Sequence, residues 1–126
     1  MSADDDAHQF AVTLEKPFGM KIGGTSDGTF VASVEEKGHA GIWNASCEGD
    51  VFDQERMIKP GDFLVGLSTS VRGMKVLAGK SYADILAFMQ SVPVGDTATI
   101  EFKRPSVGET TRFKKWCKTH NWDPNQ

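Results

Sequence analysis

The chain has 126 residues, of which 39% are hydrophobic and 25% charged, as expected for one globular domain that buries its own core. A net charge of -3 gives no general basis for binding nucleic acid, and no apolar run approaches the roughly 20 residues that span a bilayer. The acidic N-terminus is not expected to act as a signal peptide, so Cys47 and Cys117 are expected to be thiols in a cytoplasmic protein.

The N-terminal part predicts one strand after a short tail. Residues 1–8 are too polar to pack and are predicted to be disordered. Phe10, Val12 and Leu14 then alternate with polar or small residues, which predicts a strand with one buried face.

The next segment, KPFGMKIGG at residues 16–24, predicts a tight loop that leads into a second strand. Gly19 can adopt backbone angles closed to other residues, so neighbouring N–H groups can point at one anion, such as a carboxylate. Met20 and Ile22 would face one side of the strand and Lys21 the other. Residues 23–28 predict a flexible hairpin connection to a third strand.

The middle of the chain is less regular. Residues 35–41 predict a short helix or turn, and residues 42–58 predict an acidic, partly ordered insert. A fourth strand is predicted over 63–67, and a closing strand over 97–103, where Ala98, Ile100 and Phe102 alternate with polar residues.

A helix is predicted over 81–90, because Ser81 and Asp84 have the spacing of an N-terminal cap. Its apolar residues form two adjacent strips, one of which can pack inward while the other lines a groove. One strip contains Tyr82, Leu86 and Met89, and the other contains Ile85, Phe88 and Val92.

The C-terminal segment predicts one more helix. Ser106 and Glu109 repeat the capping pattern, and Phe113, Trp116, Cys117 and His120 follow at helical spacing. Residues 103–118 carry a net charge of +5, so the helix either packs its aromatic strip on the domain or lies on an anionic membrane surface.

In order along the chain, these segments resemble the PDZ domains. The residues that carry the resemblance are the loop at 17–20, the strand at 28–34, Gly38-His39-Ala40 at the start of a small helix, Gly61-Asp62 before the fourth strand, and the helix at 81–90. In PDZ domains the loop usually reads Gly-Leu-Gly-Phe, and here it reads Pro-Phe-Gly-Met. The resemblance implies a mainly β (α+β in some schemes), PDZ-like, partly open barrel of five or six strands with two helices, to which this chain adds a C-terminal helix.

The implied domain spans residues 9–104 and includes the insert at 42–58, and residues 105–126 form a C-terminal helical extension. The implied function is binding of the C-terminal tails of partner proteins, added as a strand between the second strand and the groove helix, for scaffolding or tethering. The implied ligand has a hydrophobic last residue. Because Tyr82 begins the groove helix, the residue two places before it is expected to be acidic, with an apolar residue against the Tyr82 ring as the alternative. The implied peptide-binding residues are Lys16, Phe18, Gly19, Met20, Lys21, Ile22, Tyr82, Leu86 and Met89.

Catalytic and metal sites are not predicted. Cys47 and Cys117 are the candidate nucleophiles, with His39 or His120 as base, but nothing in the sequence sets either pair side by side. Cys117 and His120 lack the second ligand pair of a structural zinc site, and no cofactor is expected. The acidic residues at 50, 53 and 55 lack the spacing of a calcium loop. The alternatives to a peptide-binding module are a membrane-surface adaptor and a regulatory PDZ-like domain of a larger protein.

Overall fold

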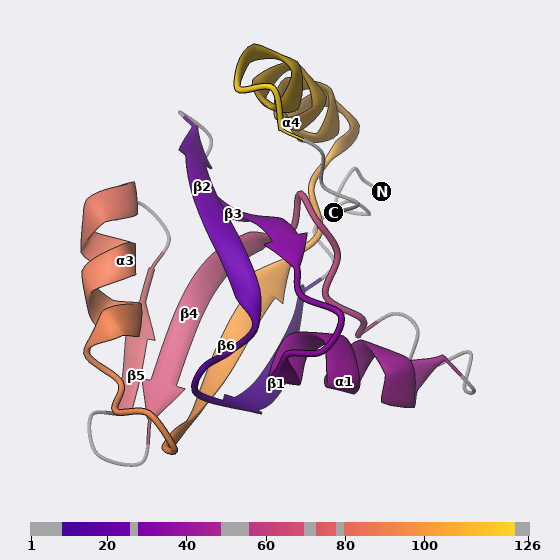
Figure 1. Cartoon of the computed structure of the whole chain (residues 1–126). Coiled ribbons are helices and arrows are strands. Elements are labelled where there is room, and N and C mark those ends of the chain that lie inside the picture. The colour runs from indigo at the N-terminus through magenta and orange to yellow at the C-terminus, as the bar shows by residue number, and fades with distance from the viewer. Residues whose placement is uncertain (1–8, 26–27, 49–55, 70–72, 78–79, 123–126) are drawn as a thin grey trace.

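The computed structural model describes residues 9–25, 28–48, 56–69, 73–77 and 80–122 (Figure 1). The N-terminal tail expected to be disordered, and residues 49–55 of the expected insert, lie outside these ranges. The acidic positions 50, 53 and 55, which lack the spacing of a calcium loop, also lie outside these ranges.

An antiparallel sheet forms the centre of the molecule (Figure 1). Five of its strands follow one another across the sheet in the order β1, β6, β4, β3, β2, and β5 pairs with β4. β2 therefore lies at an edge. The strands are β1 (Gln9–Glu15), β2 (Met20–Thr25), β3 (Gly28–Val34), β4 (Phe63–Thr69), β5 (Gly73–Val76) and β6 (Thr97–Lys103).

The second strand is longer than the sequence predicts. Gly23, Gly24 and Thr25 belong to β2 and pair with Phe30, Thr29 and Gly28 of β3. The prediction of a flexible connection over 23–28 is therefore wrong for residues 23–25. Glycine weakens an isolated strand, but it permits close approach by other parts of the fold, and here both glycines lie against side chains of helices.

Three helices lie around the sheet in the described part of the chain: α1 (His39–Cys47), α3 (Tyr82–Gln90) and α4 (Val107–Thr119). α1 includes residues 42–47, so the expected insert begins as a helix. Ser81 caps α3 by accepting a hydrogen bond from the Asp84 amide at 3.1 Å. Ser106 and Glu109 form a complete capping box at α4, as their spacing predicts.

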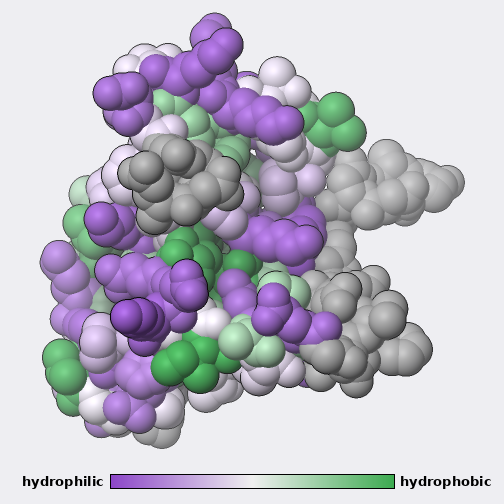
Figure 2. Space-filling view, turned by 45° about the vertical axis from the view of Figure 1, so that its right-hand side comes forward, coloured by the Kyte–Doolittle hydropathy of each residue, from purple (hydrophilic) through white to green (hydrophobic). Residues whose placement is uncertain are grey.

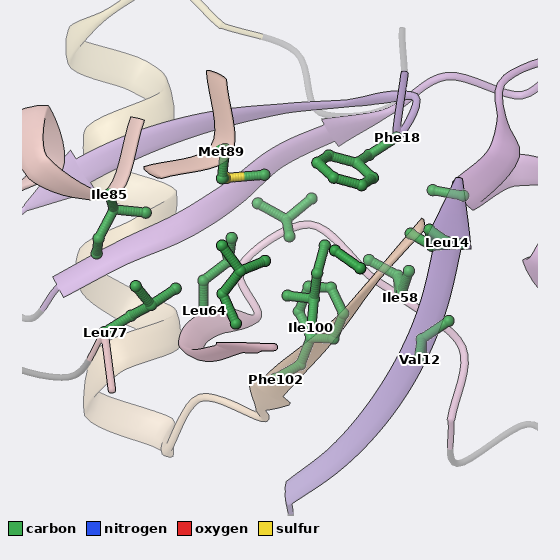
Figure 3. Close-up of a cluster of buried hydrophobic side chains, with 14 of the residues drawn as sticks. Val12, Leu14, Phe18, Ile58, Leu64, Leu77, Ile85, Met89, Ile100 and Phe102 are labelled. Carbon is green, nitrogen blue, oxygen red and sulfur yellow. The ribbon is translucent and has the colours of Figure 1, made fainter. Parts of the chain in front are cut away.

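The main core lies between α3 and the sheet. Figure 3 shows Met89 of α3 and Phe18 of the loop before β2 pointing into one cluster with Leu64 and Ile100. Ile85, Met89 and Val92 are the buried residues of the α3 region, whereas Leu86 is half-buried and Tyr82 is 40% exposed. The helix α3 thus buries one side, and the Tyr82 side chain stays exposed to solvent.

A second cluster joins α4 to the opposite face of the sheet. Phe30 of β3 makes edge-on contacts with Phe113 and Trp116 of α4, at ring-centroid distances of 5.1 and 5.0 Å. Beyond α4, the indole of Trp122 donates a hydrogen bond of 2.9 Å to the main-chain oxygen of Ala32, at the irregular point of the β2–β3 pairing. The predicted C-terminal helix is confirmed, and its aromatic strip packs on the domain.

A buried ion pair fixes the turn before β4. Asp62, 1% exposed, accepts hydrogen bonds from the Arg104 guanidinium and from the Lys59 amide. Arg104 also donates to the main-chain oxygen of Met57 and lies over the ring of Phe10. Burial raises the pKa of the Asp62 carboxyl from its ordinary value, while Arg104 and the Lys59 amide draw this pKa down.

Candidate functional site

The loop before β2 is held through its carbonyl groups. The oxygen of Pro17 contacts the Nδ1 atom of His39 at 2.7 Å, and the oxygen of Phe18 accepts from the Ala40 amide at 2.8 Å. The oxygen of Gly19 accepts from the Glu35 amide, also at 2.8 Å. Three successive carbonyls are therefore bound by Glu35 and by the first two residues of α1.

Two amides of the same loop make no hydrogen bond in the part of the chain that the structure describes. Within the described ranges, the N–H groups of Phe18 and Gly19 have no hydrogen-bond acceptor, although both residues are buried. Gly19 has φ = +80°, and a Cβ on it would lie 2.8 Å from the Gly38 Cα. Only glycine fits this position without displacing the start of α1, and the resulting conformation leaves consecutive amides available for an anion.

Lys16 connects this loop to α3. Its Nζ donates to the main-chain oxygen of Gln90, the last residue of α3, at 2.9 Å. Its backbone is held by Gly95 and Asp96, since the Lys16 oxygen accepts from Gly95 and the Lys16 amide donates to Asp96. A cation at the C-terminal end of a helix is favourably placed with respect to the helix dipole. Lys16 thus fixes the spacing between the loop and α3.

The apolar residues among the implied peptide-binding residues differ in how far they are buried. Phe18 and Met89 belong to the main core, with 6% and 8% of their surfaces exposed. Met20, Ile22 and Leu86 are only partly buried and keep surface available to a ligand. These three residues lie on the edge strand β2 and the facing helix α3.

Tyr82 lies across the edge of β2. Its hydroxyl donates to the main-chain oxygen of Ile22 at 3.4 Å. A Cβ on Gly24 would lie 2.9 Å from the Tyr82 Cβ, so the start of α3 approaches β2 closely here. Neighbouring strands need a spacing of about 4.8 Å, so a ligand strand that extends past Gly24 must separate Tyr82 from β2.

α4 forms one wall at this end of β2, which the sequence does not predict. Trp116 and His120 border a hollow of about 400 Å³ together with Tyr82 and the end of β2. The sequence predicts only that both residues lie on the apolar strip of the helix, and it pairs His120 with Cys117 as a rejected metal site. The Gly23-Gly24 pair could have predicted the contact with α4, because glycines inside a strand mark close approach by other groups.

The remaining residues considered from the sequence are not gathered into a site. Lys21 points to the α4 side, with its Nζ 5.6 Å from the centre of the Trp122 ring. His39 contacts Pro17, and the His120 Nδ1 contacts the main-chain oxygen of Trp116 at 2.9 Å. Cys47 and Cys117 are buried and not joined in a disulfide. No group of three potential metal ligands occurs in the described ranges.

The helices of the described chain are all too short or too polar to cross a membrane.

Comparison with known proteins identifies the fold. No model of a known protein family matches the sequence, and no characterised protein sequence matches it. The structure is similar to a PDZ domain from a choanoflagellate GIPC protein, with a TM-score of 0.55 and 16% sequence identity over 79% of this chain and 92% of that chain. The resemblance seen in the sequence and the expected fold class are thus confirmed, and the protein has the fold of a PDZ domain.

Proposed function

We propose that this protein is a non-catalytic module that binds the free C-terminus of a partner protein, which adds to β2 as an extra strand. The observation that carries the proposal is the open pair of buried amides at Phe18 and Gly19, next to the free edge of β2. A C-terminal carboxylate can accept from both amides while the main chain behind it pairs with the strand. Bonds from amides to an ionised acceptor are stronger than those to a neutral one.

The last side chain of the ligand would contact the partly buried residues Met20, Ile22 and Leu86, with Phe18 and Met89 behind them. All five are apolar, so we propose a hydrophobic last residue. Methionine side chains adapt their shape easily, which permits aliphatic and aromatic ends.

Tyr82 would contact the side chain of the ligand residue that lies two places before the ligand's C-terminal residue. If the last residue lies opposite Met20, this residue lies opposite Ile22, whose main-chain oxygen accepts from the Tyr82 hydroxyl. Once a ligand amide takes over that oxygen, the hydroxyl is released and can donate to a side chain. We therefore propose a preference for Asp or Glu at this position, because a carboxylate is the stronger acceptor.

The proposal is tested by measuring the affinity of one apolar-ended peptide as a free acid and as an amide, by calorimetry on the full chain. Hydrogen bonds to charged groups contribute about 1.5 to 3 kcal/mol, so amidation should weaken binding about tenfold to a hundredfold. Equal affinities for the acid and the amide would remove the carboxylate mechanism.

A matched pair of variants tests the protein side of the same contact. Gly19→Ala should weaken binding of the acid peptide, because alanine strains the loop at φ = +80°. Gly108→Ala lies in α4, where a Cβ would approach only the flexible end of Arg112 at 3.5 Å, and should leave affinity unchanged.

The membrane-surface alternative has less support. It requires an apolar strip beside the basic residues of α4, but Phe113 is 8% exposed and Trp116 packs on Phe30. The surface at the upper end of the molecule, where α4 lies, is mostly hydrophilic (Figure 2). Binding to anionic vesicles would then depend on charge alone and would disappear at high salt.

A further inference from the structure

The hollow beside β2 provides a second contact for a ligand, away from the carboxylate loop. It has a volume of about 400 Å³ and lies between the start of α3 and the end of α4. In the described chain, no lysine, arginine, aspartate or glutamate lines it. The lining residues are Ile22, Gly23, Gly24, Thr25, Tyr82, Trp116 and His120.

Flat aromatic surfaces border this hollow. The imidazole of His120 stacks on Trp116, with the ring centres 4.3 Å apart and the planes 22° apart. Trp116 lies over Gly23, where a Cβ would be 2.9 Å from the indole, and Tyr82 lies equally close to Gly24. Because the strand between them carries no side chain at two successive positions, Trp116 and Tyr82 can both lie close to its backbone and border the hollow at the end of β2.

Strand geometry determines which ligand residue reaches this hollow. With its carboxylate at the Phe18 and Gly19 amides, the ligand runs antiparallel to β2 and its last residue lies opposite Met20. The third residue before the last then lies opposite Gly23. Directly opposed residues of antiparallel strands place their side chains on the same face, and the Gly23 position faces Trp116.

We propose that Trp116 and His120 bind an aromatic side chain three places before the ligand's last residue. This inference rests on the proposed function and adds a second determinant of ligand choice, supplied by the C-terminal helix. Aromatic pairs contribute beyond their buried area in stacked or edge-on arrangements, and Trp116 and His120 present both a ring face and ring edges.

The hydrogen bonding of His120 leaves one ring nitrogen for an aromatic ligand that carries a donor. Its Nδ1 lies 2.9 Å from the main-chain oxygen of Trp116, an acceptor, so Nδ1 carries the proton. In the neutral ring Nε2 is then an acceptor. It can accept from the N–H of a ligand tryptophan or the O–H of a ligand tyrosine.

Two free-acid peptides that differ only in Trp or Ala three places before the end test the proposal on the full chain. Wild type should bind the Trp peptide about two- to tenfold more tightly, the range expected for an aromatic pair. His120→Ala should remove this preference. Lys118→Ala, an exposed change on the same helix outside the hollow, should keep it. An equal preference in wild type and His120→Ala, or a preference for Asp at this position, would overturn the proposal.

A probe without a terminal carboxylate separates this inference from the proposed function. N-acetyl-tryptophanamide should shift the NMR signals of the Gly23 and Gly24 amides in wild type and shift them less in His120→Ala. Carboxylate-dependent peptide binding without a Trp preference or probe shifts would overturn the aromatic site alone. Probe shifts together with equal binding of acid and amide peptides would overturn the carboxylate mechanism alone, and the absence of all of these effects would overturn both.

Discussion

The Tyr82 hydroxyl and the main-chain oxygen of Ile22 are joined by a hydrogen bond of 3.4 Å across the edge of β2. A ligand strand needs this same oxygen as an acceptor for its own amide. The side chain and the ligand therefore compete for one atom. Tyr82 therefore opposes pairing of the ligand with β2 and is also the proposed contact for an acidic ligand side chain. The two roles can be separated by mutation.

Tyr82→Phe removes the hydroxyl and keeps the ring. A peptide with Ala two places before its end should bind this variant as tightly as wild type, or up to about fivefold more tightly, because a hydrogen bond worth about 0.5 to 1 kcal/mol no longer competes. A peptide with Asp at that position should lose its advantage over the Ala peptide. Calorimetry with both peptides measures the two effects, and an Asp advantage that survives in Tyr82→Phe would exclude the hydroxyl contact.

Gly24→Ala should destabilise the fold by about 1 to 3 kcal/mol, because the new Cβ would lie 2.9 Å from the Tyr82 Cβ and backbone must move. Urea denaturation gives the free energy of unfolding. Gly108→Ala is the control, since α4 has room for a methyl group and alanine favours helix. If both variants were as stable as wild type, α3 would not lie against β2 in solution.

Phe113→Ala should lower the free energy of unfolding by about 3 kcal/mol or more, because it removes a buried ring that contacts Phe30. Val107→Ala, at a side chain that is 86% exposed on the same helix, should have little effect. Thermal or urea denaturation compares the two. An unchanged stability in Phe113→Ala, combined with weaker binding to anionic vesicles, would instead support the membrane-surface alternative.

The pH dependence of stability tests the environment of Asp62. Burial raises the pKa of this carboxyl in the folded protein, so the folded state holds the proton more tightly than the unfolded state. The associated stabilisation is fully present below the unfolded pKa and is lost as pH rises through the folded pKa. Relative to Asp62→Asn, which cannot titrate, wild type should therefore lose stability as pH rises above about 4. Urea denaturation at several pH values measures this difference, and a difference that grows with pH would mean that Arg104 outweighs burial.

Local patterns were sufficient to predict most of the elements. The alternation in β1 and β6, and the caps at Ser81 and Ser106, depend on residues close in sequence, and the structure has each of them. The loop around Gly19 was found in the same way, because a positive φ at glycine is a local property.

Long-range contacts explain what was missed. The sequence predicts a connection at Gly23 and Gly24 because glycine is a poor strand former. In the structure they belong to β2, where the absence of side chains lets Trp116 and Tyr82 approach from distant parts of the chain. Trp122 lies beyond the end of α4, after Asn121, which has φ = +53°. Its hydrogen bond to the Ala32 oxygen depends on an irregularity in strand pairing that the sequence does not reveal.

Because α4 packs on Phe30, the smallest stable fragment of this protein must include α4. A fragment cut after residue 104, where the PDZ-like segment predicted from the sequence ends, would expose Phe30 and Phe63, now 1% and 6% exposed, to water. It would also leave the Ala32 oxygen without the Trp122 indole. Such a fragment would have an exposed aromatic surface patch and would be prone to self-association. Expression work on this fold should therefore retain the chain through residue 122.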